Sequence, residues 1–94
     1  MDRSSPIHEA LRAVQRAMKT RRVALGMSQE VAAARAGIAL GTLRRFERTG
    51  EISLRRLLAL LQLYGMDRRI IPHFEDMSWW RLAEVRRAET RQKA

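Results

Sequence analysis

Arginine and apolar side chains alternate over a short stretch near the middle of the chain, at Leu43, Arg44, Arg45, Phe46 and Arg48. Leu43 and Phe46 are three positions apart, so on a helix they share one face while the arginines line another. Guanidinium groups form paired hydrogen bonds with guanine edges and phosphate oxygens. The pattern predicts a helix that packs on one side and binds a polyanion with the other.

A second short helix is predicted directly before the basic one. Ser28 can cap a helix over residues 29–36 by accepting a free backbone N–H, and Gly37 can end it in the left-handed conformation. The basic helix then spans residues 40–48. Two short helices joined at a glycine, with arginines on the second, form the helix–turn–helix that major-groove readout requires.

Composition favours one small domain with an anionic partner. The chain has 94 residues, 46% of them apolar, and 19 Lys and Arg against 10 Asp and Glu give a net charge of +9. Such an excess attracts DNA, RNA or an anionic membrane surface. Arginine supplies nearly all of this charge, which suits bidentate contacts, although genomic base composition also sets this preference.

Several classes of protein are not supported by the sequence. There is no cysteine, and His8 and His73 lie far apart, so no metal site is expected. No cofactor loop or nucleophile–base arrangement is present, and we do not expect an enzyme. No apolar run reaches the roughly 20 residues that span a bilayer, and the N-terminus lacks a signal-peptide core. A cytoplasmic protein, nucleoid-associated when bound to DNA, is the expectation.

Helical periodicity and caps organise the rest of the chain. After a flexible segment 1–5, Ser5 and Pro6 predict the start of a helix that stops at Gly26. Ser53 predicts a leucine-rich helix over residues 54–64. The first helix carries an apolar stripe made by Leu11, Val14, Met18 and Leu25.

The C-terminal third is expected to be divided. Asp67 is predicted to cap a short fifth helix that Pro72 limits or distorts, and Ser78 to cap a final basic amphipathic segment. The predicted organisation is therefore a helix–turn–helix domain over 6–76 and a helical extension over 77–94. Strand alternation and hairpin dipeptides are missing, so the fold class is all-α.

The motifs in their order and spacing resemble the Cro/C1-type (XRE) helix-turn-helix family, from about residue 11 to 66. The resemblance rests on Gly26-Met27-Ser28-Gln29-Glu30, Ala36-Gly37-Ile38, Thr42-Leu43, Phe46-Glu47 and Ser53-Leu54. It implies a lambda-repressor-like domain of five helices, here with a short C-terminal helical extension. The continuous phrase from Thr42 to Leu54 is also similar to HipB-like antitoxins that accompany HipA-like kinase toxins.

The resemblance implies roles for individual positions. Helix 40–48 would be the recognition helix, with Leu40, Gly41, Arg44 and Arg45 facing the bases and Arg48 at a phosphate. Gln29 would sit against a phosphate at the start of its helix, where free N–H groups favour anions. The hydroxyl of Thr42 would reach the DNA backbone. Arg22 and Glu47 would form a structural ion pair between the first and third helices.

Three departures from the family pattern change which residues are expected to contact the bases. Ala39 stands where a capping Ser or Thr is common, and Val31 where a glutamate often completes a capping box. Leu40 and Gly41 stand where polar residues are common. Direct readout is therefore expected mainly from Arg44 and Arg45, with Leu40 available for a thymine methyl.

The expected function is sequence-specific binding of double-stranded DNA as a dimeric transcriptional repressor. The alternative is an antitoxin that binds a HipA-like kinase and represses its own operon, and these two roles are compatible. Trp79 and Trp80 could cover the core, anchor a homodimer or dock onto a toxin. No membrane partner is expected.

Overall fold

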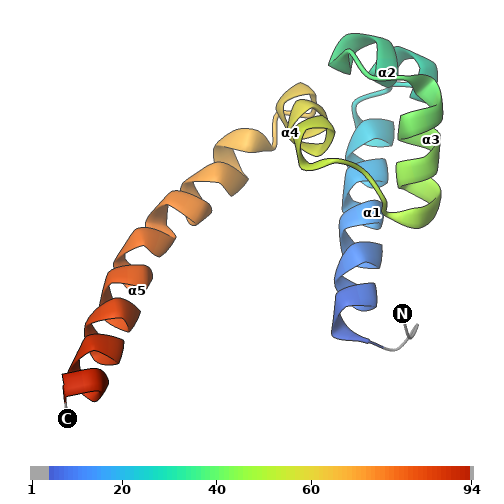
Figure 1. The fold of residues 1–94 in the computed structure, drawn as a ribbon. Helices are drawn as coiled ribbons and strands as arrows, with labels where there is room; N and C mark the ends of the chain where they lie inside the picture. The colour runs from blue at the N-terminus through green and yellow to red at the C-terminus, as the bar shows by residue number, and fades with distance from the viewer. Residues whose placement is uncertain (1–4, 94) are drawn as a thin grey trace.

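The computed structural model describes the backbone of residues 5–93 and the side chains of residues 5–76 and 84–91. The regular structure in this part of the chain is entirely helical, which confirms the all-α prediction. The helices, shown in Figure 1, are α1 (Pro6–Ala24), α2 (Gln29–Ala36), α3 (Leu40–Thr49), α4 (Leu54–Leu63) and α5 (Asp67–Lys93).

Serine caps start three of the helices where the sequence places them. Ser5 accepts the N–H of His8, and Ser28 accepts that of Val31, each at 3.1 Å. Ser53 caps α4 in the same way. α3 begins after Ala39 with no side-chain cap, as its sequence predicts. The bounds of α1 to α4 therefore agree with the prediction to within a residue or so, because capping depends on local residues.

α5 corrects the prediction for the C-terminal third. One continuous helix passes through both Pro72 and Ser78, so Pro72 does not end the helix and no new helix begins at Ser78. Pro72 is the sixth residue of α5, and its missing N–H removes one hydrogen bond, the one to the carbonyl of Arg68. The rest of the helical ladder continues on both sides. The division into domains at residue 77 stays a prediction.

The start of α5 also differs from expectation, since Met66 rather than Asp67 occupies the cap position. The carbonyl of Met66 accepts the N–H of Ile70 at 3.2 Å, so Asp67 is already the first helical residue. An acidic side chain in the first turn is still favourable, because it lies at the positive end of the helix dipole.

A small apolar core lies among the first four helices. Its buried members are Met18, Met27, Ala32, Ala33, Leu43, Phe46, Leu60, Leu61 and Tyr64. Met66 and Ile70 pack against this core from the beginning of α5. A domain with so few buried side chains is only marginally stable. Single groups inside it therefore carry a large share of the total stability.

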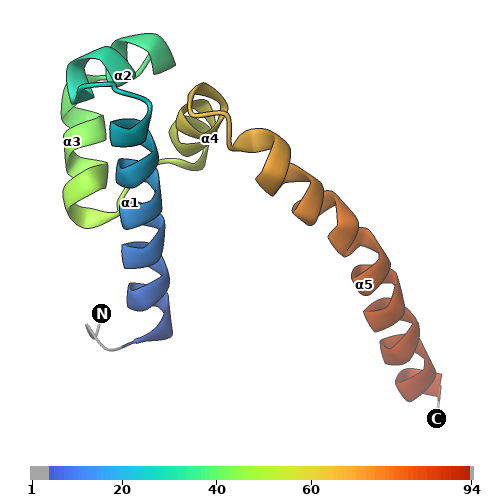
Figure 2. The same ribbon diagram turned by 180° about the vertical axis from the view of Figure 1, so that it is seen from behind.

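α5 projects away from the rest of the molecule. Figures 1 and 2 show α1 to α4 gathered together, with the C-terminal end of α5 far from them. The radius of gyration is 17.5 Å, against about 12 Å for a compact chain of this length. Phe74 and Val85 on α5 are exposed apolar side chains. The long helix therefore offers surface that the core of the same chain does not cover.

Tyr64 combines deep burial with an unsatisfied hydroxyl. Its side chain is 1% exposed, and its hydroxyl has no hydrogen-bond partner within the described part of the chain. Burial raises the pKa of this phenol above its ordinary value, and the nearby Glu47 carboxylate raises it further while Arg22 opposes the shift. The folded state therefore favours the neutral phenol.

Tyr64→Phe is expected to leave the protein at least as stable as the wild type, because an orphaned buried hydroxyl costs about 1–3 kcal/mol. The neutral phenol stabilises the fold fully below the unfolded-state pKa, and this contribution is lost as pH rises through the higher folded-state pKa. Tyr64→Phe has no phenol to ionise and should therefore not lose stability in this way at alkaline pH. Thermal melts at neutral and alkaline pH check this, with Tyr64→Leu as the control for ring packing; a clear loss of stability in Tyr64→Phe at neutral pH would contradict it.

Candidate nucleic-acid interface

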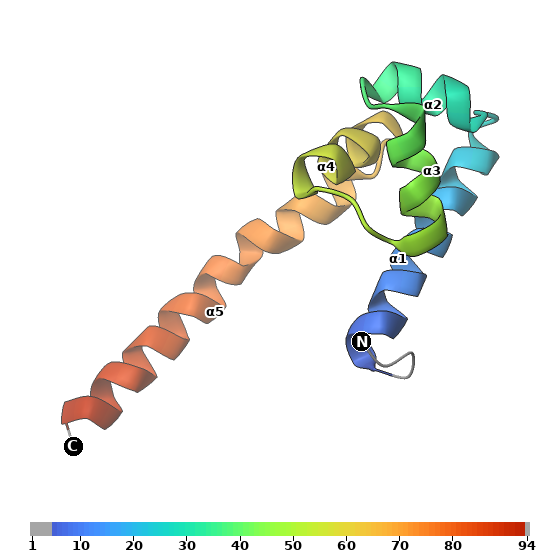
Figure 3. The same ribbon diagram turned by 45° about the vertical axis from the view of Figure 1, so that its right-hand side comes forward.

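α2 and α3 form a compact helix–turn–helix beside α1 (Figure 3). Gly37 ends α2 with a φ of 71°, a left-handed conformation that glycine adopts without steric cost. The N–H of Ile38 then returns to the carbonyl of Ala33 at 3.0 Å and closes the turn. α3 packs against both α1 and α2, so its orientation depends on both of these helices.

α3 presents an apolar face to the core and a basic face to solvent. Leu43 and Phe46 are fully buried, with exposed fractions of 0% and 1%. The outward face is made by residues spaced at three, four and seven positions, which lie in one row on a helix. This basic face consists of Gly41, Arg44, Arg45 and Arg48, all of them exposed.

A buried ion pair fixes α3 against α1. Arg22 donates from Nε to Oε2 of Glu47 at 2.7 Å and from Nη2 to Oε1 at 2.9 Å. Its remaining Nη1 donates to the carbonyl of Met27 at 2.8 Å. The two side chains are only 9% and 5% exposed. The hydrogen bond with Glu47 raises the pKa of Arg22, against the opposing effect of burial, so the pair stays charged.

Gln29 belongs to the same network. Its Nε2 donates to Oε1 of Glu47 at 3.0 Å, so the carboxylate joins α1, α2 and α3. The resemblance assigned Gln29 to a phosphate, whereas its side-chain amide in this structure points toward the ion pair. Its backbone N–H remains part of the first turn of α2, where the helix dipole attracts anions.

Leu40 and Thr42 are less exposed than the four residues of the basic face. Leu40 is partly buried and packs against the apolar core, which gives it a structural role at the start of α3. Thr42 is half-buried on the same helix. The structure therefore separates Leu40 and Thr42 from the outward row of side chains.

Two arginines of the basic face form ion pairs that the sequence analysis missed. Arg44 donates from Nη2 to Oε1 of Glu30 on α2 at 3.0 Å, and Arg45 donates from Nη2 to Oε2 of Glu51 after α3. Both pairs are largely exposed. The Arg44 pair joins residues 14 positions apart on different helices, and helical periodicity gives no signal for such a contact.

Gly41 lies at the exposed front of α3 with open space around it. Apart from its two chain neighbours and the backbone of α3 itself, no heavy atom of the described chain lies within 4 Å of the position where a Cβ would stand, and its backbone is helical. Neither packing nor backbone conformation within the protein therefore requires glycine there. A close approach by another molecule is a remaining reason for glycine.

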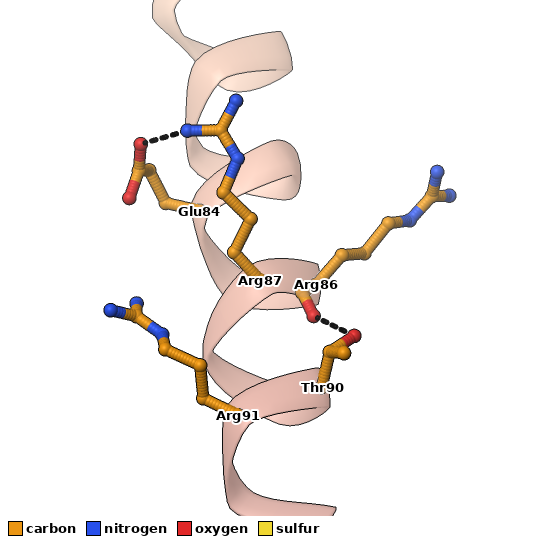
Figure 4. A pocket seen from close by; sticks show the side chains of 5 residues that line it. All are labelled: Glu84, Arg86, Arg87, Thr90 and Arg91. Atoms are coloured by element: carbon orange, nitrogen blue, oxygen red, sulfur yellow. Dashed lines mark hydrogen bonds and ion pairs between the residues drawn. The ribbon is translucent and has the colours of Figure 1, made fainter. Parts of the chain in front are cut away.

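The C-terminal half of α5 carries further basic side chains. Figure 4 shows Glu84, Arg87 and Arg91 on one side of the helix and Arg86 on the other. Arg87 donates to Glu84 at 3.2 Å, and all three arginines are exposed. Together with Thr90, these side chains line a shallow, open pocket on the surface of this one helix. The side chains of Trp79 and Trp80 lie outside the described residues.

Other site types find little support. The described residues contain no cluster of histidine and acidic side chains that could hold a metal ion. None of the described helices is both long and apolar enough to cross a membrane. The basic face of α3 is thus the feature whose chemistry and geometry point most directly to a ligand.

Comparison with known proteins agrees with this geometry. A family model described as helix-turn-helix matches residues 18–71, more than half of the chain and the segment that includes α2 and α3. Searches of curated proteins and of solved structures found no match. The matched family binds DNA and is not a family of enzymes. With its capped α2, glycine turn and basic α3, this chain belongs to the Cro/C1-type helix-turn-helix family.

Proposed function

We propose that this protein is a sequence-specific transcriptional regulator, a dimeric repressor that inserts α3 into the major groove of DNA. The observation that carries the proposal is the basic face of α3, Gly41, Arg44, Arg45 and Arg48, opposite a buried apolar face. An α-helix fits the major groove, and an arginine there can bind guanine through two hydrogen bonds. The arrangement of α1 to α4 is consistent with a lambda-repressor-like domain.

Roles within this proposal follow from position on α2 and α3. Arg44 and Arg45 are the candidates for base contacts. Arg48, one turn further on, is a candidate for phosphate contact, and the N-terminus of α2 at Gln29 is another. Phosphate contacts would supply salt-dependent affinity and base contacts would supply selectivity.

A homodimer would place two recognition helices about 34 Å apart on a pseudo-palindromic site. The surface that supports this part of the proposal is α5, which projects from the domain and exposes Phe74 at 65% and Val85 at 49%. The solution mass of the full chain, compared with a chain ending at residue 77, tests it. A dimer that survives the truncation would argue against residues 78–94 as the interface and leave Phe74 as the candidate.

The test of the function is binding to a fluorescent fragment from upstream of the protein's own gene, across a salt series with unrelated DNA as competitor. Tight binding that withstands the competitor is expected for a specific regulator. Equal, weak and salt-sensitive binding to both DNAs would instead show that the net charge alone is acting.

A protein partner is the second candidate, and the exposed apolar residues of α5 favour it. In this role the chain would be an antitoxin that binds a HipA-like kinase through α5 and represses its own operon through α3. The two roles use different surfaces and are compatible. A gene for a HipA-like kinase beside this one, and co-purification of the two products, would support it; a neighbourhood without such a gene would argue against it.

Gly41→Ala is expected to stabilise the fold while weakening DNA binding. Alanine is favoured over glycine in a helix by about 0.5–1 kcal/mol, and the added methyl group meets open space in the free protein. In the groove the same methyl group would hold α3 away from the bases. Thermal melts and binding isotherms together check this. Higher stability with unchanged affinity would show that DNA does not approach this position.

A further inference from the structure

Each of two arginines on the basic face is paired with an acidic residue from a neighbouring segment. Glu30 in the first turn of α2 accepts from Arg44, and Glu51 in the loop after α3 accepts from Arg45. Arg48, on the same face, has no ion pair among the described residues. The acids therefore bind the side chains that are the candidates for base contacts.

Local structure holds Glu51 in place independently of its arginine. The N–H of Glu51 donates to Oγ1 of Thr49 at 3.1 Å, and that hydroxyl donates to the carbonyl of Arg45 at 2.8 Å. Gly50 caps α3 between them, with its N–H donating to the carbonyl of Phe46 at 2.7 Å. The carboxylate thus starts from a fixed backbone position at the C-terminal end of α3.

Glu30 is anchored in a comparable way at the start of α2. It follows the cap residue Ser28 and lies in the first helical turn. A hydrogen bond from its own backbone N–H lowers the pKa of its carboxyl group; desolvation opposes this shift, and Arg44 and Ser28 add to it. The group is an anion at neutral pH, close to the N-terminus where the helix dipole attracts negative charge.

The two pairs differ from the buried Arg22–Glu47 pair in a way that lets another anion replace the acidic partner. Arg22 uses Nε and Nη2 together and is 9% exposed, whereas Arg44 uses Nη2 alone and is 53% exposed. Arg45 likewise uses only Nη2 and is 63% exposed. Exposed pairs of this kind contribute little stability and break easily. Nη2 is also a donor that a guanidinium uses for paired contacts with guanine or phosphate.

We propose that Glu30 and Glu51 are internal competitors of DNA, which hold the terminal nitrogens of Arg44 and Arg45 and so limit the affinity of this strongly basic protein for any duplex. This inference rests on the proposed function. A phosphate or base must displace each carboxylate, and the freed carboxylate then stands near the DNA backbone. Both effects weaken binding on every sequence.

The test is binding of the full chain to a labelled duplex of arbitrary sequence, by fluorescence anisotropy across a salt series. Glu30→Gln and Glu51→Gln should each tighten binding about two- to fivefold, the equivalent of one exposed pair. The salt dependence should steepen, because the arginine then binds phosphate without leaving a bare carboxylate. The matched control is Glu84→Gln, which removes the same charge from an exposed pair on α5.

Double variants decide whether the acids act through the arginines. Glu30→Gln should give a smaller gain in an Arg44→Ala background, and Glu51→Gln a smaller gain in an Arg45→Ala background, because only the repulsion between the carboxylate and DNA is then left to remove. An equal gain without the arginine, or an equal gain in Glu84→Gln, would overturn the inference. Weaker binding after either Glu→Gln change would do so too, since it would mean that the acid orients the arginine for DNA.

Failure of the inference can be told from failure of the proposed function. If all variants bind the arbitrary duplex equally, while the upstream fragment is still preferred, only the competitor role is wrong. If no variant binds any duplex at low salt, the DNA-binding function itself is wrong and the inference falls with it.

Discussion

Replacing Glu47 with alanine is expected to lower the free energy of unfolding by about 3–5 kcal/mol, because it leaves the buried guanidinium of Arg22 without its counter-charge. The carboxylate also accepts from Gln29, so a second, partly buried donor loses its partner. Such a loss is a large fraction of the 5–15 kcal/mol or so that stabilises a typical domain. Thermal and urea denaturation measure it directly.

DNA binding should fall in the same variant even at temperatures where it is folded, because the carboxylate sets the position of α3 relative to α1 and α2. Glu84→Ala is the matched control, since it removes a glutamate from an exposed pair with Arg87 on α5. That change should stay within about 0.5 kcal/mol of the wild type. An unchanged melting temperature in Glu47→Ala would contradict this prediction.

Arg44→Ala and Arg45→Ala are expected to reduce affinity for the preferred DNA site by about 1–3 kcal/mol each where the residue reads guanine, or about 5- to 150-fold. Stability should change little, because both side chains are exposed and their ion pairs are weak. Binding isotherms on the preferred site, on single-base variants of it and on unrelated DNA separate the two types of contact.

A base-reading arginine loses selectivity at one position of the site when it is replaced, whereas a phosphate-binding arginine loses the same affinity on every sequence. Arg87→Ala is the control, because it removes an exposed, paired arginine from the distant part of α5. If neither variant on α3 binds DNA more weakly than this control, the basic face is not the interface.

The helices of the domain could be predicted because their signals are local. Ser5, Ser28 and Ser53 each bond an N–H three residues further on. The same kind of reasoning was wrong for α5, where Pro72 was expected to limit or distort a short helix and Ser78 to cap a new one. A proline inside a helix costs about 3 kcal/mol or more, but each further residue of a helix that has already started adds a hydrogen bond. A sequence pattern does not weigh these two effects against each other.

The candidate site was predictable in outline from the sequence. The apolar residues Leu43 and Phe46 and the arginines between them fix which side of α3 faces the core, because helical geometry places positions three and four apart on one face. Gly41 joins the outward row by the same rule. The partial burial of Leu40 was not predicted, because it depends on how closely the start of α3 packs against the rest of the domain.

The sequence by itself determined the helical class, the helix–turn–helix and the basic face of α3, since these follow from bonds and periodicities within about four residues. Only the tertiary structure decided what those side chains touch. The bond of Glu47 to Gln29 spans 18 residues, and the bond of Glu30 to Arg44 spans 14. Contacts of that kind depend on the angles between packed helices, which the core as a whole sets.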